Sequence, residues 1–141
     1  METSGGRRHR SFRFSEETLR RLDARAHEIS ETRTALAERY VEEGLRMEEH
    51  PGIGFADGPA GRRAVLLGTG LDAWEVIATL KANAGSAKAT AAYLDLSIGM
   101  VRAAVRYYAA FPDEIEAILD RQAALARRQQ EAAERERAIL K

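Results

Sequence analysis

The first residues whose types and spacing could do chemistry stand in an alternating segment near the start of the chain. His9, Ser11 and Arg13 occupy every second position, and Phe12 and Phe14 occupy the positions between and after them. Side chains of an extended chain point alternately to two faces, so the polar residues would share one face and the phenylalanines the other. Arginine can bond guanine through two hydrogen bonds, and serine and histidine can bond base edges or phosphates. The spacing therefore predicts a strand with one face suited to nucleic acid and one apolar face.

This segment belongs to a basic arm. Residues 1–14 carry four arginines against one glutamate, a net charge of +3, although the whole chain balances 22 Lys and Arg with 22 Asp and Glu. A short basic segment on a neutral body is typical of a polyanion contact, and a solvated tail is the alternative. Arg10 falls on the phenylalanine face. We expect it to lie at the end of the strand and to extend toward backbone phosphates.

Two helices are expected after the strand. Ser15 precedes two glutamates, and Thr32 precedes a second apolar stripe, and both hydroxyls are typical of helix N-caps. The backbone N–H groups of Arg33 and Thr34 would form a phosphate site at the second N-terminus. The apolar stripes of the two helices are formed by Leu19, Leu22, Ala26 and Ile29, and by Leu36, Tyr40, Val41 and Leu45.

The unit of residues 7–49 is too small to stand alone. One strand and two helices enclose a small core, and a single strand leaves its backbone N–H and C=O groups without partners. A second copy of the chain solves both problems, because two antiparallel strands make a ribbon and four helices then cover the phenylalanine face. The outward face of such a ribbon fits the major groove of B-DNA. We therefore expect a homodimer that binds double-stranded DNA.

These stretches resemble the ribbon-helix-helix DNA-binding proteins. Residues 11–15 match the alternating strand, and the Thr-Arg-Thr of residues 32–34 stands where the family has Ser-Arg-Ser. Ser30 replaces the usual turn glycine, and Glu31 replaces an apolar residue. The resemblance implies a transcriptional repressor that reads bases with its strands and holds phosphates at its helix N-termini. The predicted DNA-binding residues are His9, Ser11, Arg13, Arg8, Arg10, Thr32, Arg33 and Thr34.

Residues 50–112 are predicted to form a second domain, with a small β-hairpin around a Gly/Pro-rich turn and then three helices. Ser86 and Ser97 are expected to cap two of these helices, at 86–94 and 98–111. Three residues join the two helices, which is helix-turn-helix spacing. Arg102 and Arg106 would lie on the recognition helix, and a packing or dimerisation domain is the alternative. Three stretches, at residues 50–54, 62–71 and 101–108, resemble the domain-of-unknown-function family number 433, in which an arginine usually stands at the position of Gly70.

Residues 113–141 contain no glycine or proline and are predicted to form one long helix. Apolar residues recur at intervals of seven from Ile118 and from Leu119, but three of these eight residues are alanine, so the helix is better suited to a partner's groove than to a coiled coil. A charged helix lying on its own domain is the alternative. The predicted partner-binding residues are Ile115, Ile118, Leu119, Leu125, Arg127 and Arg128.

The second resemblance also suggests what that partner is. Members of the family are similar to antitoxins that are encoded beside PIN-type ribonuclease toxins. The resemblance implies an antitoxin that neutralises a PIN-type toxin and represses its own operon, and arginines of the tail could neutralise the carboxylates of the toxin's metal site. A stand-alone ribbon-helix-helix regulator and an interaction adaptor without DNA binding are the alternatives.

Other chemistry is not indicated. The chain has no cysteine, and its three histidines share no metal-ligand spacing. We expect no enzyme activity, no cofactor and no metal site, because nucleotide-binding and nucleophile motifs are also missing. No apolar run approaches the ~20 residues of a membrane span, and no secretory pattern follows Arg7 and Arg8, so we expect a cytoplasmic protein. The expected fold class is mainly α with short β (α+β).

Overall fold

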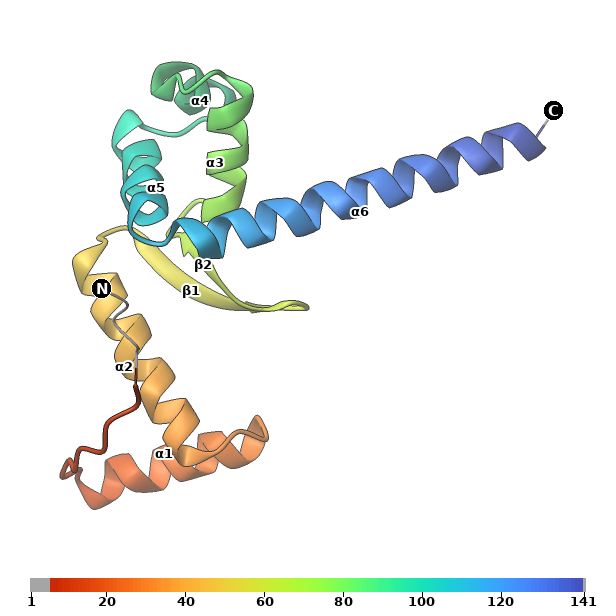
Figure 1. Ribbon diagram of the computed structural model, residues 1–141. Coiled ribbons are helices and arrows are strands. Elements are labelled where there is room, and N and C mark those ends of the chain that lie inside the picture. Colours follow the sequence, from red (N-terminus) through yellow and green to blue (C-terminus); the bar gives the residue numbers. More distant parts are fainter. Residues whose placement is uncertain (1–5, 141) are drawn as a thin grey trace. The chain divides into compact units, whose positions relative to one another are not determined.

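The structure, a computed structural model, describes residues 6–140, which are mainly helical with one small sheet (Figure 1). The expected fold class is thereby confirmed. The chain divides into two compact units, Met1–Glu42 and Glu43–Lys141, where the sequence led us to expect boundaries at residues 50 and 113. The boundary between the units, after Glu42, falls inside the helix Arg33–Glu49. The first turns of the C-terminal helix pack into the core of the second unit.

The first unit is built on two capped helices. The helix α1 (Glu16–Glu28) begins where the Ser15 hydroxyl accepts a hydrogen bond from the Thr18 N–H at 3.1 Å. The helix α2 (Arg33–Glu49) begins where the Thr32 hydroxyl accepts one from the Ala35 N–H at 3.1 Å. Both N-caps stand where the sequence predicts them, because capping depends only on residues within one turn.

The turn between α1 and α2 places Ser30 in the left-handed region, with φ at 56°. The Ser30 N–H donates to the His27 carbonyl at 3.3 Å, and the Glu31 N–H donates to the Ala26 carbonyl at 3.0 Å. These bonds end α1 in the manner usual for a glycine. Ser30 therefore adopts the conformation of the glycine that the ribbon-helix-helix resemblance leads one to expect here, at the cost of backbone strain.

A three-stranded antiparallel sheet opens the second unit. The strands β1 (Ile53–Gly58) and β2 (Gly61–Leu66) form the predicted hairpin, in which Ile53 pairs with Leu66 and Gly58 with Gly61. A third strand that the sequence did not predict, β3 (Leu71–Asp72), pairs with the end of β2 after the turn at residues 68–70. The Asp72 carboxylate then accepts hydrogen bonds from the side chains of Arg63, at 3.0 Å, and Trp74, at 3.1 Å, and so ties the sheet to the next helix.

Four helices complete the second unit, close to their predicted bounds. They are α3 (Ala73–Ala82), α4 (Ala87–Leu94), α5 (Ile98–Ala110) and α6 (Pro112–Ile139). The Ser86 and Ser97 hydroxyls cap α4 and α5 as expected. The helices α3, α4 and α5 pack on one another, and Val101 and Tyr107 of α5 are fully buried among them. The buried core of the unit consists of Ile53, Ala64, Leu66, Ala73, Val76, Ile77, Ala91, Val101, Ala104, Tyr107 and Ile115.

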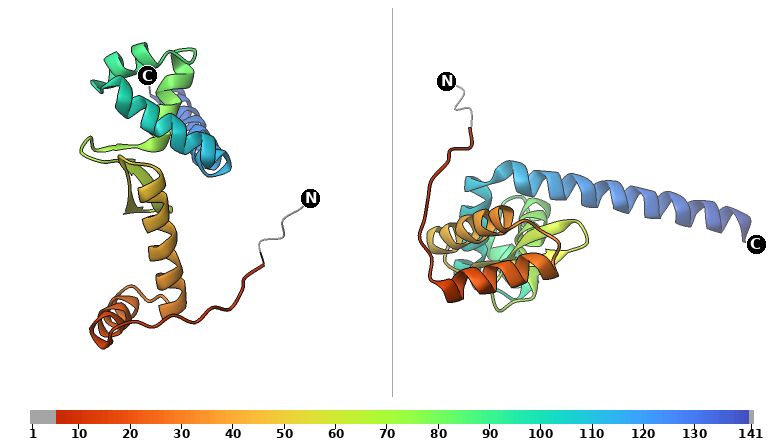
Figure 2. Two further views of the ribbon diagram at one scale, coloured as in Figure 1. Left: turned by 90° about the vertical axis from the view of Figure 1, so that its left-hand side faces the viewer. Right: turned by 90° about the horizontal axis from the view of Figure 1, so that it is seen from below.

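The long helix α6 has two different halves. Its first turns contribute the buried Ile115 and the partly buried Leu119 to the core of the unit, whereas nearly every residue after Asp120 is exposed. The outer half extends beyond the other elements of the unit (Figures 1 and 2). No helix within residues 6–140 combines the length and the apolar character that crossing a membrane requires.

Candidate nucleic-acid interface

The described part of the basic arm, residues 6–14, precedes α1 in the chain and has no regular secondary structure. Residues 6–15 form no helix and no strand paired within the single chain (Figure 2). A strand needs a neighbour for its hydrogen bonds, and the sequence analysis expects that neighbour in a second copy. All described residues of the arm are exposed, and Phe12 retains 76% and Phe14 48% of its accessible surface. Two large aromatic rings therefore stand uncovered.

The arm nevertheless alternates as the sequence predicts. A hollow of about 590 Å³ lies between the arm and the helices of the first unit. His9, Ser11 and Arg13 line neither this hollow nor the one beside it. The residues of the arm that line it are Arg7, Arg8, Arg10, Phe12 and Phe14. The phenylalanine side of the arm thus faces the helices, and the three predicted base-reading residues stand apart from that side.

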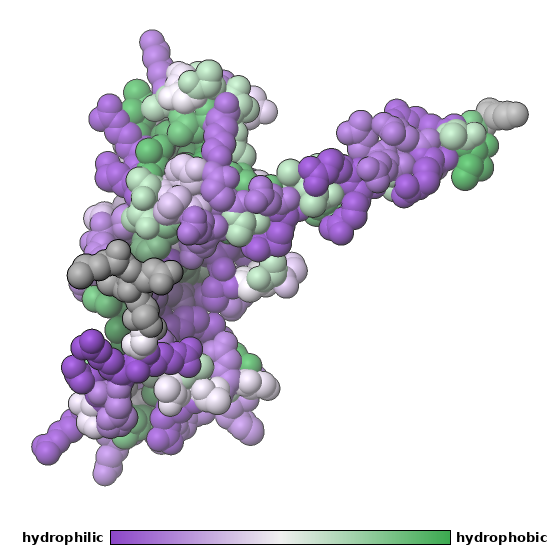
Figure 3. Space-filling model, in the orientation of Figure 1, coloured by the Kyte–Doolittle hydropathy of each residue, from purple (hydrophilic) through white to green (hydrophobic). Residues whose placement is uncertain are grey.

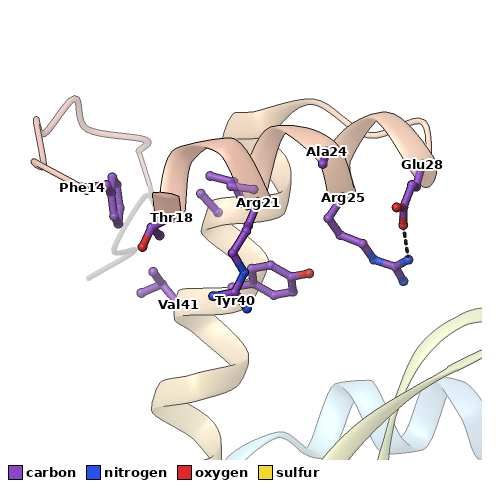
Figure 4. Close-up of a pocket in the computed structure, with 10 residues that line it drawn as sticks. Phe14, Thr18, Arg21, Ala24, Arg25, Glu28, Tyr40 and Val41 are labelled. Carbon is purple, nitrogen blue, oxygen red and sulfur yellow. Dashed lines mark hydrogen bonds and ion pairs between the residues drawn. The ribbon is translucent and has the colours of Figure 1, made fainter. Parts of the chain in front are cut away.

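The apolar face that α1 and α2 share is also exposed. A second hollow, of about 600 Å³, is shared by Phe14, Thr18 of α1, and Tyr40 and Val41 of α2 (Figure 4). Val41 is 60% exposed although it lies on the predicted apolar stripe. Among the described residues of the first unit, only Ala26 and Leu36 are buried. The unit therefore has almost no core of its own.

The charges of the first unit are divided between paired and unpaired cations. On the helices, Arg20 pairs with Glu17 and Arg25 with Glu28 within α1. Both pairs are spaced i,i+3 along the helix. On the arm, no ion pair joins Arg7, Arg8, Arg10 or Arg13 to an acidic residue within residues 6–140. The arm is thus a cationic segment that the folded chain leaves unneutralised.

The sequence predicts a phosphate contact at Arg33, whereas in the structure its side chain forms an ion pair with Asp23. The guanidinium donates through Nε and Nη2 to the two carboxylate oxygens of Asp23 in α1, and the Nη2–Oδ2 distance is 2.9 Å. The Thr32 hydroxyl is engaged as the N-cap, and Thr34 lines the hollow beneath the arm. What the N-terminus of α2 still offers an anion is the set of first-turn N–H groups that no carbonyl of the helix accepts. That first turn carries no acidic residue.

The predicted partner-binding residues of α6 fall into two groups. Ile115 is fully buried in the core of its own unit and is therefore unavailable to a partner, and Ile118 and Leu119 are half-buried. Leu125 is 41% exposed, and Arg127 and Arg128 are exposed beside it. The surface of the outer half of α6 is largely hydrophilic (Figure 3). The segment that a partner can reach thus begins after Asp120, later than the sequence suggested.

One polar cluster was missed from the sequence. Arg46 of α2 donates to the Tyr107 hydroxyl and to the Glu114 carboxylate, both at 2.9 Å, and Tyr107 donates to Glu114 at 2.5 Å. The guanidinium also stacks on the Phe111 ring, 3.8 Å from its centroid. Burial raises the pKa of Tyr107, and the neighbouring carboxylate adds to the effect. Arg46 is more than sixty positions from Tyr107 and Glu114 in the sequence, so no local pattern predicts its contacts with them.

No group of three or more His, Asp or Glu side chains able to hold a metal ion occurs within residues 6–140. Comparison of the chain with known protein families, with curated proteins and with solved structures finds no match. The function of the chain is therefore inferred from the residues and contacts described above.

Proposed function

We propose that this chain is one subunit of a homodimeric ribbon-helix-helix transcriptional repressor that also acts as the antitoxin of a PIN-type ribonuclease. The observation that carries the proposal is the alternation of the arm. Phe12 and Phe14 face an open apolar hollow, and Arg13 stands outside it with no acidic partner among the described residues. A segment with this alternation can pair through its backbone N–H and C=O groups with a second strand and can bind an anion on its outer face.

A second copy of the chain is the occupant that best completes the apolar face. It brings the strand that the arm's backbone lacks and a second pair of phenylalanines of the same size. Fully burying one phenylalanine side chain contributes about 1.5–3 kcal/mol, so four rings per dimer offer a large gain to a unit with so little core of its own. The exposed Val41 and Tyr40 extend the same surface.

The outer face of the paired arms would then meet DNA. A two-stranded ribbon enters the major groove, where Arg13 can bond guanine and His9 and Ser11 can bond base edges or phosphates. Arg8 and Arg10, on the hollow side, would reach phosphates at the ends of the ribbon. The N-terminus of α2 supplies backbone N–H groups for a further phosphate on each side.

The antitoxin part of the proposal is supported by α6. A helix whose first turns are held in a core and whose outer half is exposed can offer that half to another protein. Leu125 supplies an apolar contact, and Arg127 and Arg128 supply cations for the carboxylates of a nuclease site. The resemblance of the middle segment to toxin-associated proteins is the reason for proposing a PIN-type toxin as that partner.

The DNA part is tested with an electrophoretic mobility shift on the DNA segment immediately upstream of the protein's own coding sequence. Arg13→Ala should cost ~1–3 kcal/mol for each lost base contact, and each dimer loses two. The affinity of the natural chain should fall steeply with salt, because phosphate contacts release counterions. An unchanged shift with Arg13→Ala, or binding insensitive to salt, would favour an adaptor without a DNA role.

The antitoxin part is tested by truncating the chain after Gln122. This cut leaves Ile115 and Leu119 in place, so the second unit should keep its fold by circular dichroism. The truncated protein should lose its ability to inhibit and co-purify with the ribonuclease encoded by the adjacent reading frame, while DNA binding persists. Full inhibition by the truncated chain would remove α6 from the proposal and leave a stand-alone repressor.

A further inference from the structure

The second unit contains a helix pair that the proposed function does not use. The helix α4 has eight residues, a three-residue turn follows, and α5 has thirteen residues. Asp95 begins the turn in the left-handed region, with φ at 55°, and the Leu96 N–H donates to the Ala91 carbonyl at 2.9 Å. Together with α3, the pair forms the three-helix arrangement in which helix-turn-helix proteins present a recognition helix (Figure 1).

The helix α5 has a clean division between a buried and an exposed face. Val101, Ala104 and Tyr107 are fully buried against the rest of the unit. Arg102 and Arg106 are exposed on the opposite face, four residues apart and thus one turn along the same side. The helix is held firmly from behind, and its arginines point to the outside of the unit.

The cations of this surface are not neutralised by the unit's own acidic residues. Lys88 of α4, Arg102 and Arg106 form no ion pair with any residue between 6 and 140, whereas Lys81 pairs with Glu116 and Arg63 with Asp72. Neither α4 nor α5 contains an acidic residue. Lys81 and Arg63 thus form ion pairs within the fold of the unit, whereas Lys88, Arg102 and Arg106 are exposed on α4 and α5, as other unpaired arginines are on the outer half of α6.

A glycine on the same face has no internal explanation. Gly99 lies in the first turn of α5 and is exposed, one turn before Arg102. A Cβ atom added there would meet only the Ser97 hydroxyl, at an ordinary 3.7 Å, and its φ is not positive. Neither packing nor backbone conformation therefore requires glycine. A glycine without an internal role, on a cationic helix face, is suited to the close approach of an external molecule.

We infer that α5 is a second DNA-binding element, with Arg102 and Arg106 facing the major groove and Gly99 allowing close approach of the helix. Lys88 would contact a phosphate beside the groove. The inference goes beyond the proposed ribbon site and is independent of it, because it depends only on contacts within the second unit. An acidic protein surface is the competing occupant, and the experiment separates the two.

The experiment compares variants of the full chain on the same upstream DNA segment and on a scrambled duplex. Arg102→Gln with Arg106→Gln should weaken binding at least tenfold and should lower the slope of log K against log[salt] by up to about two. The matched control is Arg135→Gln with Arg137→Gln, which removes the same charge from exposed positions of α6 and should leave DNA affinity unchanged.

Gly99→Ala adds a test that does not alter charge. Alanine at this exposed helical position should keep or raise the melting temperature, since alanine favours helix. DNA affinity should nevertheless fall severalfold, because the methyl group obstructs close approach. Binding by the Gly99 and Arg102/Arg106 variants equal to that of the control would overturn the inference, whatever acidic protein they bind.

The two sites fail separately. If the Arg102/Arg106 variant loses affinity while Arg13→Ala does not, α5 binds DNA and the ribbon proposal is wrong. If Arg13→Ala loses affinity while the Arg102/Arg106 variant matches its control, the ribbon proposal stands and the second element is absent. A weaker residual affinity in the combined variant than in either single one is the result expected when both sites bind.

Discussion

Arg33 and Asp23 join the start of α2 to α1, with Arg33 Nη2 2.9 Å from Asp23 Oδ2. The arginine that the sequence places at a phosphate site is thus engaged by a carboxylate of its own unit. Both side chains are about half exposed, so the pair contributes little to stability. The pair matters more for electrostatics, because the Asp23 carboxylate lies next to the N-terminus of α2, where we propose that a phosphate binds.

We therefore predict that Asp23→Asn strengthens DNA binding. The substitution removes the competing carboxylate and frees the Arg33 guanidinium for a phosphate, so affinity should rise severalfold at low salt. The free energy of unfolding should change by less than ~1 kcal/mol, as for other exposed pairs. Mobility shifts and denaturant unfolding measure the two quantities, with Glu17→Gln, which breaks the Arg20 pair in α1, as the control. A weaker affinity for Asp23→Asn than for the control would contradict this role.

The two faces of the arm should be separable by substitution. Phe12→Ser removes apolar surface from the dimer contact, and at about 1.5–3 kcal/mol per ring and two rings per dimer it should shift the protein toward monomer. Ser11→Ala alters the opposite face, so it should leave the dimer intact and weaken DNA binding. Sedimentation equilibrium gives the first result and mobility shifts the second. A Phe12→Ser protein that remains as dimeric as the natural chain would refute the ribbon.

Ser30 offers a test of backbone strain. Because its φ of 56° suits glycine, Ser30→Gly should stabilise the fold by about 0.5–1 kcal/mol. The control is Ala24→Gly, an exposed position within α1, where glycine should instead cost about 1 kcal/mol. Thermal unfolding of both variants should show shifts of opposite sign. Destabilisation by both would mean that the turn carries no strain for glycine to relieve.

The Tyr107 hydroxyl should give stability an alkaline limit. Its pKa is raised in the folded chain, so the unfolded chain releases this proton first as the pH rises. The stability that the hydroxyl contributes is complete below its ordinary pKa of about 10 and is lost as the pH climbs above that value. Tyr107→Phe should therefore flatten the decline in unfolding free energy that sets in above about pH 10. Equal declines in both proteins would place the titrating group elsewhere.

Elements that depend on neighbouring residues could be predicted from the sequence. The N-caps at Ser15, Thr32, Ser86 and Ser97 stand as expected, and so do the helices that follow them. The turn between β1 and β2 also lies where glycine and proline indicate it. Capping and turn formation are decided within about four residues, so the local chain contains the information.

The contacts between distant residues required the folded chain. Ile115 and Leu125 are both predicted partner-binding residues of the C-terminal segment, yet the first is buried and the second is exposed. The short β3 has two residues and exists because β2 lies beside it. Arg33 meets Asp23, and Arg46 meets Tyr107 and Glu114, only after the helices pack. Helical periodicity shows which side of a helix is apolar, but where along its length that side is covered depends on elements far away in the sequence.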